Sequence, residues 1–136
     1  MRQILVLGRS DAERLVADPE WAVISIHDPN KSTPELRVGW GAVLTLAFHD
    51  KEDPELARMT GFWQLFRAEQ ARAACSFVER QVKSSTGLLI HCESGLSRSP
   101  AMARAMAERF GWVINSDWPR GNQLVYALTK GEESVA

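Results

Sequence analysis

The segment HCESGLSRS, residues 91–99, spaces a cysteine, a glycine, an arginine and a serine in a way that suits oxyanion chemistry. An apolar run, residues 88–92, precedes it, and an Ala/Met-rich helical pattern follows from Arg98. A loop that leads from a strand into a helix directs backbone N–H groups inward, and the helix dipole adds positive potential there. The same field favours the thiolate form of a cysteine. The spacing therefore predicts an anion-binding loop with Cys92 as its nucleophile.

Each position of this loop has a chemical reason. Gly95 allows a close approach of the backbone or a positive φ. Arg98 can donate two parallel N–H bonds to an oxyanion, which the ammonium group of a lysine cannot do. Ser99 can donate a hydroxyl hydrogen bond to sulfur and so ease its departure from a phosphoryl group. The predicted phosphate-binding loop comprises Glu93, Ser94, Gly95, Leu96, Ser97 and Arg98. The alternative is that Cys92 is an inert, buried cysteine at the end of a strand.

The motif resembles the His-Cys-x5-Arg-Ser/Thr signature of the cysteine-dependent protein tyrosine phosphatase superfamily. The wider pattern is similar to its small dual-specificity-like members, especially a bacterial group of compact, predicted tyrosine phosphatases. The resemblance implies two displacements at phosphorus. Cys92 attacks and forms a phosphocysteine while an acid protonates the leaving oxygen, and the same group then acts as a base that activates water.

Other families of anion-binding proteins share part of this pattern. Rhodanese-type sulfurtransferases cradle an anion around a loop cysteine, but His91 and Ser99 disfavour that reading. Low-molecular-weight phosphatases carry Cys-x5-Arg near the N-terminus, whereas Cys92 lies two-thirds along this chain. A phosphate-binding module without useful catalysis is the remaining alternative.

The resemblance places the general acid on a separate loop after a neighbouring strand. Asp50 directly follows an apolar run, residues 42–48, and is therefore the first candidate. Asp53 in the same loop and Asp28 after the run 21–26 are the alternative acids. Acidic residues in charged loops are most often only solvated, so any of the three can lack a role in catalysis. We expect His49 to pack or to orient Asp50. We expect His91 to be structural and to hydrogen-bond loop carbonyls.

The hydrophobic periodicity predicts one α/β domain over residues 1–136, with a three-layer α/β/α arrangement and a mainly parallel central sheet. Strands are expected at 2–8, 21–26, 42–48 and 88–92, and helices at 11–19, 62–83, 98–110 and within 118–131. Ser10 is the expected N-cap of the first helix. Parallel sheets bind ligands beyond the carboxyl ends of their strands. The loops 49–61 and 92–98 should therefore open on the same edge.

Composition limits the functions that this chain is expected to have. The formal net charge is −1 and no run rich in Lys and Arg occurs, so we expect no nucleic-acid partner. No stretch has the length of a membrane span or of a secretory signal, and only two cysteines occur, so a cytoplasmic protein is expected. His27, His49 and His91 lack metal-ligand spacing, and we expect neither a metal nor a cofactor. Cys75 is expected to be a core residue.

The loop composition also bears on the substrate. Its interior contains no lysine, and Glu93 would repel a multiply phosphorylated ligand unless its side chain turns outward. The expected partner is therefore a singly phosphorylated group, on a protein or on a small aryl phosphate, and free phosphate or sulfate should occupy the same loop. Phe62, Trp63 and Trp118 either line an entrance or belong to the core. Asn122 is expected to cap a helix or tie a loop.

Overall fold

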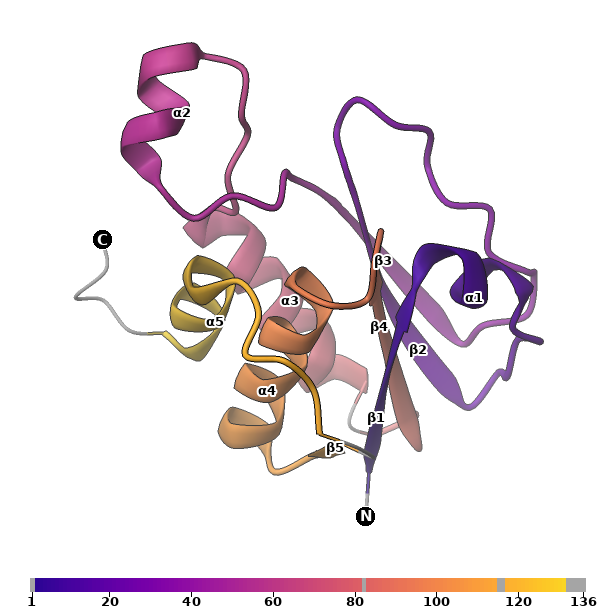
Figure 1. Ribbon diagram of the computed structural model, residues 1–136. Coiled ribbons are helices and arrows are strands. Elements are labelled where there is room, and N and C mark those ends of the chain that lie inside the picture. Colours follow the sequence, from indigo (N-terminus) through magenta and orange to yellow (C-terminus); the bar gives the residue numbers. More distant parts are fainter. Residues whose placement is uncertain (1, 82, 115–116, 132–136) are drawn as a thin grey trace.

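A single parallel sheet forms the centre of the molecule (Figure 1). The computed structural model describes residues 2–81, 83–114 and 117–131. Within them, five strands lie in the order β3-β2-β4-β1-β5, and every neighbouring pair is parallel. The strands are β1 (Gln3–Gly8), β2 (Trp21–His27), β3 (Ala42–Ala47), β4 (Gly87–Cys92) and β5 (Val113–Ile114). The α/β prediction is confirmed, and among these strands only the two-residue β5 was not expected.

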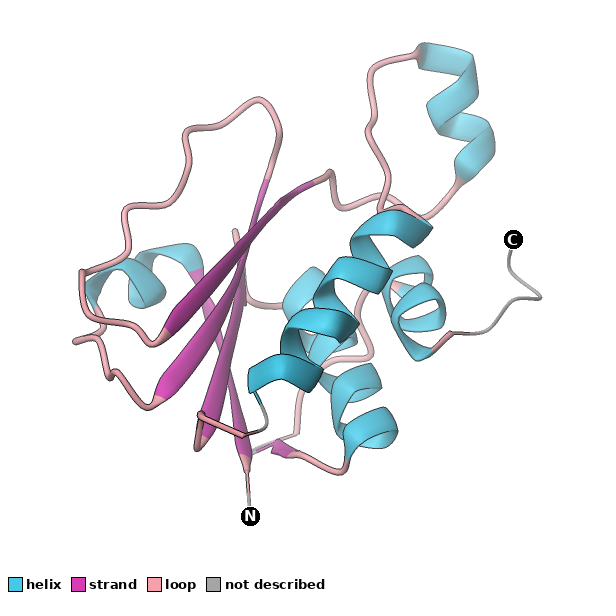
Figure 2. Ribbon diagram, turned by 180° about the vertical axis from the view of Figure 1, so that it is seen from behind, coloured by secondary structure: helices cyan, strands magenta, loops and turns pink. Residues whose placement is uncertain are grey.

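Helices flank both faces of the sheet, as Figure 2 shows from behind. One face is covered by α3 (Ala68–Gln81), α4 (Arg98–Phe110) and α5 (Gln123–Lys130). The other face carries α1 (Arg9–Arg14) together with the long segment 28–41. A further helix, α2 (Pro54–Thr60), projects from the body and buries none of its residues. The three layers are therefore unequal, with most of the helical mass on one side.

Strand β4 lies in the middle of the sheet and is buried along its whole length. Leu88, Ile90 and Cys92 belong to the larger core beneath α3, α4 and α5. Leu89 faces the opposite way and packs with Ala12 and Val23 in the smaller core. Because both faces are covered, this strand reads as a continuous apolar run rather than an alternating one.

Two predicted boundaries in the segment that follows β3 were wrong. The expected loop 49–61 contains α2, which is capped by Asp53 and closed by Gly61 in the left-handed conformation. The expected helix 62–83 begins only at Ala68, and residue 82 lies outside the described residues. Residues 62–67 stay outside the helix because Gln64 exchanges two hydrogen bonds with His49 instead.

The first helix also differs from its prediction. It spans Arg9–Arg14 rather than 11–19, and Gly8 rather than Ser10 occupies the N-cap, without a side-chain cap. The backbone N–H of Arg9 donates to the carbonyl oxygen of Glu93 at 3.1 Å. The cysteine loop, rather than a serine side chain, thus accepts a hydrogen bond from the first turn of this helix.

The register of the sheet brings the functional loops to one edge. Gly8 of β1 lies opposite Cys92 of β4, and Ser25 of β2 lies opposite His91. All of these strands run in the same direction, so the segments that follow β1, β2, β3 and β4 emerge together. The expectation that loops 49–61 and 92–98 open on the same edge agrees with this topology.

Candidate active site

The sulfur of Cys92 lies in a nest of donors at the start of α4. The backbone N–H groups of Gly95 and Ser99 point at Sγ, with N···S distances of 3.2 Å and 3.4 Å. Ser99 Oγ lies 3.2 Å from the same sulfur and donates when the sulfur is a thiolate. The N-cap of α4, Ser97, makes no side-chain cap, and the N–H of Ser99 in the first turn of this helix points at the sulfur. Backbone dipoles, a hydroxyl and the helix dipole therefore converge where negative charge is needed.

The shape of this loop depends on close packing against β1. Gly95 has φ +78°, and a Cβ there would lie 2.6 Å from the nitrogen of Gly8 and 2.8 Å from the carbonyl carbon of Leu7. Real side chains do not tolerate such distances against backbone atoms. The glycine that the motif predicted is thus required by its surroundings as well as by its own conformation.

Arg98 is anchored at one end of its guanidinium and unpaired at another atom. It is 4% exposed, and its Nη1 donates to Asp28 Oδ1 at 2.7 Å and to the carbonyl oxygen of Phe48 at 2.6 Å. Its Nε is buried and has no hydrogen-bond partner. A buried, unpaired N–H on a cation costs free energy unless a ligand accepts its hydrogen bond. An oxyanion in the loop would supply the acceptor.

Glu93 turns away from the loop interior. Its Oε2 accepts from Arg9 Nη1 at 3.3 Å and from the backbone N–H of Asp28 at 3.2 Å. Its negative charge is therefore paired beside β1 and β2 rather than facing a bound anion. This orientation meets the condition that the sequence analysis set for phosphate binding in a loop that contains a glutamate.

Of the three candidate acids, Asp50 and Asp28 contact the phosphate-binding loop, Asp50 through Ser97 and Asp28 through Arg98. The Oδ1 of Asp50 accepts from Ser97 Oγ at 2.8 Å and from Asn122 Nδ2 at 2.9 Å, and the residue is exposed. Asp53 instead caps α2, accepting from the backbone N–H of Glu55 at 2.9 Å. Asp28 orients Arg98 and also lies 3.6 Å from Lys31. Each acid thus has a distinct role in the structure, and Asp50 is the acid that contacts Ser97 of the loop.

The two expected structural histidines both have defined partners. His91 is fully buried, with Nδ1 3.3 Å from the carbonyl oxygen of Cys92 and Nε2 2.6 Å from Ser25 Oγ. A carbonyl oxygen only accepts, so Nδ1 carries the proton and Nε2 accepts from the serine hydroxyl. Burial lowers the pKa of His91, which favours this neutral form. His49 packs between rings and pairs with Gln64 and Asn30.

The candidate entrance residues divide into two groups. Trp118 is partly buried against the larger core. Phe62 is 54% exposed and stacks on His49, while Trp63 packs edge-on against Phe62 and carries Lys51 Nζ 4.4 Å above its ring. These aromatic residues lie on the acid-bearing side of the edge, beside the segment that contains Asp50. Of the three aromatic residues, Trp118 therefore packs on the core, whereas Phe62 and Trp63 lie beside the segment of Asp50.

Cys75 behaves as a core residue, as predicted. It is 5% exposed within the larger core, and burial raises the pKa of its thiol. It lies on α3, where its Sγ is 3.5 Å from the carbonyl oxygen of Thr129. Arg109 Nη1 also donates to this sulfur at 3.5 Å, whereas the sulfur of Cys92 accepts from two backbone N–H groups.

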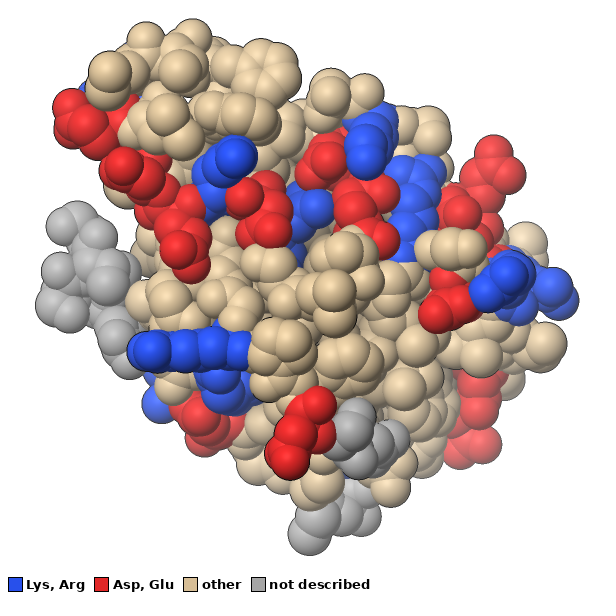
Figure 3. All heavy atoms as spheres, viewed as in Figure 1, with Lys and Arg blue, Asp and Glu red and all other residues tan. Residues whose placement is uncertain are grey.

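Side chains of both signs alternate over the face that Figure 3 shows, without a broad patch of one sign. Ion pairs join Arg9 to Glu13 and Glu93, and Lys31 to Asp28, along the carboxyl edge.

No cluster of three or more His, Cys, Asp or Glu among the described residues could hold a metal ion. No helix in the described part of the chain is long and apolar enough to cross a membrane.

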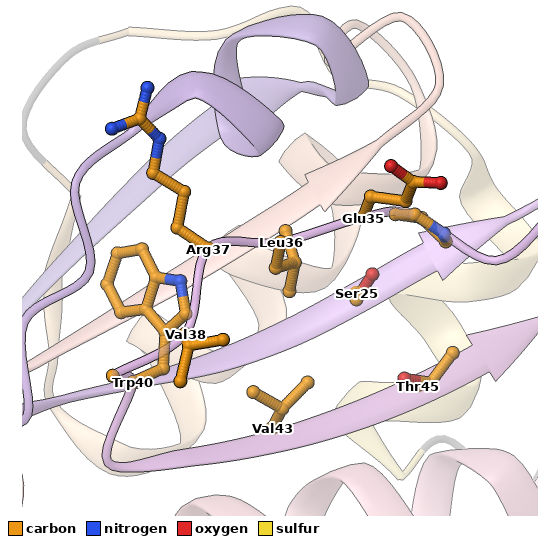
Figure 4. A pocket seen from close by; sticks show the side chains of 10 residues that line it. Ser25, Glu35, Leu36, Arg37, Val38, Trp40, Val43 and Thr45 are labelled. Atoms are coloured by element: carbon orange, nitrogen blue, oxygen red, sulfur yellow. The ribbon is translucent and has the colours of Figure 1, made fainter.

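A separate groove of about 470 Å³ lies over β2, β3 and the segment 34–40 (Figure 4). Leu36, Val38, Trp40 and Val43 form its apolar lining, and the hydroxyls of Ser25 and Thr45 lie along its strands. None of its lining residues comes from the cysteine loop, and the hydroxyl of Ser25, which is buried, is bound to His91 Nε2 at 2.6 Å. The chemistry predicted from the sequence is therefore confined to the carboxyl edge of the sheet.

Three contacts that organise this site were not predicted from the sequence. They are the ion pair between Asp28 and Arg98, the pairing of Arg9 with Glu93, and the hydrogen bond from Asn122 to Asp50. Each joins residues more than 65 positions apart, so no local pattern carries it. The expectation that Asn122 caps a helix or ties a loop is confirmed, because it does both.

Comparisons with known proteins add no relative to this picture. No family model, no curated protein and no solved structure matches the chain.

Proposed function

We propose that this protein is a phosphomonoester hydrolase that works through a phosphocysteine on Cys92. The observation that carries the proposal is the donor nest at Sγ, formed by Gly95 N–H, Ser99 N–H and Ser99 Oγ beside a buried, unpaired Arg98 Nε. The nucleophilic sulfur and the oxyanion site thus come from one short segment. The arrangement is what the resemblance to cysteine-dependent tyrosine phosphatases implies.

In the first step, the thiolate attacks phosphorus and the bond between phosphorus and the leaving oxygen breaks. Asp50 donates its proton to that oxygen, and the alcohol or phenol departs. The developing charge on the phosphoryl oxygens is met by the loop N–H groups and by Arg98. Asp28 and the carbonyl of Phe48 hold the guanidinium in place for this task.

In the second step, water attacks the phosphocysteine and gives one proton to Asp50. The bond between phosphorus and sulfur breaks, and inorganic phosphate forms. Ser99 Oγ stabilises the returning thiolate through its contact with Sγ. The chain regains its starting state without an oxidant, a reductant or a further reactant.

The paired Glu93 and the lack of a lysine in the loop support a singly phosphorylated substrate. Phosphorylated protein and small aryl phosphates both fit this description. Phe62 and Trp63 supply an aromatic surface beside the acid.

The test is the turnover of p-nitrophenyl phosphate, with rapid denaturation in detergent at alkaline pH to trap a phosphoryl adduct on Cys92. Replacing the nucleophile by Cys92→Ser should lower kcat by at least about 1,000-fold and remove the adduct. Cys75→Ser is the matched control and should keep both the rate and the adduct. Turnover that survives Cys92→Ser would overturn the nucleophile assignment.

The alternative functions give different results in the same preparation. Binding of phosphate without turnover would indicate a phosphate-binding module. Transfer of sulfur from thiosulfate to cyanide would indicate a sulfurtransferase. Either outcome, without hydrolysis, would overturn the proposal.

A further inference from the structure

Asn122 connects three segments that are distant in the sequence. Its side chain is 1% exposed and lies at the start of α5, where Oδ1 accepts from the backbone N–H of Val125 at 3.0 Å. Its Nδ2 donates to Asp50 Oδ1 at 2.9 Å and to the carbonyl oxygen of Lys51 at 3.2 Å. Its backbone N–H donates to the carbonyl oxygen of Ser97 at 3.1 Å. One buried residue therefore binds the phosphate-binding loop and the acid-bearing segment at once.

The approach of this residue to the loop is close. Gly121, the preceding residue, has φ +75°, and a Cβ there would lie 2.3 Å from the carbonyl oxygen of Ser97. Only glycine allows the chain to pass so near, and this passage brings the N–H of Asn122 onto the same oxygen. The contact is thus specified by two consecutive residues.

Both hydrogen bonds to Asp50 fall on the same carboxyl oxygen. Ser97 Oγ and Asn122 Nδ2 each donate to Oδ1, which occupies the two lone pairs of that atom. A proton on this carboxyl group therefore belongs on Oδ2. The two donors also fix the rotation of the carboxyl group relative to the loop that would hold the phosphoryl group.

We propose that Asn122 is a positioning residue that holds Asp50 against the phosphate-binding loop, with Oδ2 as the atom that exchanges the proton. The inference rests on the proposed hydrolase function, because it assigns a role within that reaction. Asn122 itself touches no reacting atom. Its contribution is to keep the acid within reach of the leaving oxygen, where a displacement of about 1 Å lowers rates by about 100-fold.

Two substitutions separate this role from helix capping. Serine caps helices as well as asparagine does, so Asn122→Ser keeps the hydrogen bond to Val125 but loses the donor to Asp50. Asn122→Asp also keeps the cap, but it places a carboxylate against Oδ1 of Asp50. At low pH, a protonated Asp side chain at position 122 can again donate to that oxygen.

The expected result for Asn122→Ser is a kcat lowered by about 10- to 100-fold with an unchanged KM. The urea midpoint should fall, because the bonds to Asp50 and to the carbonyl oxygen of Lys51 are both lost. For Asn122→Asp, the rate relative to wild type should rise as the pH falls, because the donor is restored on protonation. Asp53→Ser, a matched exchange of one N-cap residue at α2, should leave kcat unchanged. A kcat within twofold of wild type in Asn122→Ser would overturn the inference, as would an equal loss in Asp53→Ser.

An NMR measurement distinguishes this inference from the proposed function. The side-chain amide resonances of Asn122, identified by their absence in Asn122→Ser, should shift in Asp50→Ala whether or not the protein hydrolyses a phosphate ester. If wild type shows no hydrolysis but the resonances shift, the hydrogen bond stands and the assigned catalytic role fails with the hydrolase proposal. Resonances that do not move in Asp50→Ala would overturn the inference directly.

Discussion

The two sides of the candidate site are built differently. The phosphate-binding loop packs against β1, α4 and the start of α5, and both Cys92, which precedes it, and Arg98, at its end, are buried. The segment opposite it, residues 49–63, contains the exposed Asp50 and a helix, α2, that buries no residue. The nucleophile and clamp thus rest on dense packing, whereas the acid rests on a few hydrogen bonds.

This difference has a physical reason. Donors that stabilise developing charge are effective only if they are fixed before the reaction, and burial provides that rigidity. An acid must instead approach a leaving group that changes with the substrate, so a segment at the surface suits it. Two bonds to Asp50, from Ser97 and Asn122, link the exposed side to the rigid side.

The first prediction, with the largest expected loss of stability, compares two glycines, one on each side. Gly95→Ala introduces a Cβ 2.6 Å from the nitrogen of Gly8 at a positive φ. It should lower the free energy of unfolding by about 3 kcal/mol and kcat/KM by at least about 100-fold. Urea titration and p-nitrophenyl phosphate turnover measure the two quantities.

Gly61→Ala is the matched control for that substitution. Its φ is +65°, but a Cβ there would meet no atom within 4 Å. Only the backbone cost of about 1 kcal/mol remains, and kcat/KM should stay within about twofold of wild type. Equal losses in the two variants would show that packing does not separate the two sides.

The second prediction concerns the two aspartates of the exposed side. Asp50→Asn keeps an oxygen for Ser97 but cannot supply a proton, so kcat should fall by about 100-fold or more. Asp53→Asn keeps the cap of α2 and should leave kcat within about twofold. The loss in Asp50→Asn should be greater for phenyl phosphate than for p-nitrophenyl phosphate, because phenolate is the poorer leaving group.

Leaving groups of different acidity therefore make the measurement specific. An equal loss with both esters would contradict a role for Asp50 in protonating the leaving oxygen. A greater loss in Asp53→Asn than in Asp50→Asn would exchange the two assignments.

The smallest expected effect concerns His91, the buried residue that precedes Cys92, and its contribution to the pH dependence of stability. Burial lowers the pKa of His91 in the folded state, so the unfolded chain binds a proton more readily. Stability from this residue is complete above the unfolded pKa of about 6.5 and decreases as the pH falls below it. Urea midpoints measured from neutral pH downward should decrease, and His91→Asn should flatten this dependence.

The His91 prediction also has a contrary outcome. If His91→Asn retained the same decrease below neutral pH, another group would be responsible for it. His91 would then contribute only its contacts with Ser25 and the carbonyl of Cys92.

The elements that were predicted correctly depend on interactions between residues close in the sequence, and those that were predicted wrongly depend on contacts between distant segments. The helix 98–110 was predicted at its observed bounds, since Pro100 in the first turn and the Ala/Met pattern are local signals. Ser10 failed as a cap because Gly8 lies against the cysteine loop, where a Cβ would be 2.9 Å from the carbonyl oxygen of Ser94. The helix predicted from residue 62 failed because His49, a residue from another segment, binds Gln64.

The candidate site shows the same division. Cys92, Gly95, Arg98 and Ser99 lie within eight residues, and their spacing alone predicted a donor nest that the geometry of the loop supports. The spacing did not predict which atom of Arg98 stays unpaired or that Arg9 neutralises Glu93. Those features depend on which strands are neighbours.

The sequence by itself determined the α/β class, the central buried strand and the composition of the cysteine loop, because periodicity, turn residues and loop spacing are properties of adjacent positions. Only the tertiary structure decided the roles of the three acids. Asp28 orients Arg98, Asp53 caps α2, and Asp50 meets the loop through Ser97 and Asn122. A carboxylate in a charged loop has the same local signature in all three cases, and its partner is set by chain segments that only folding brings together.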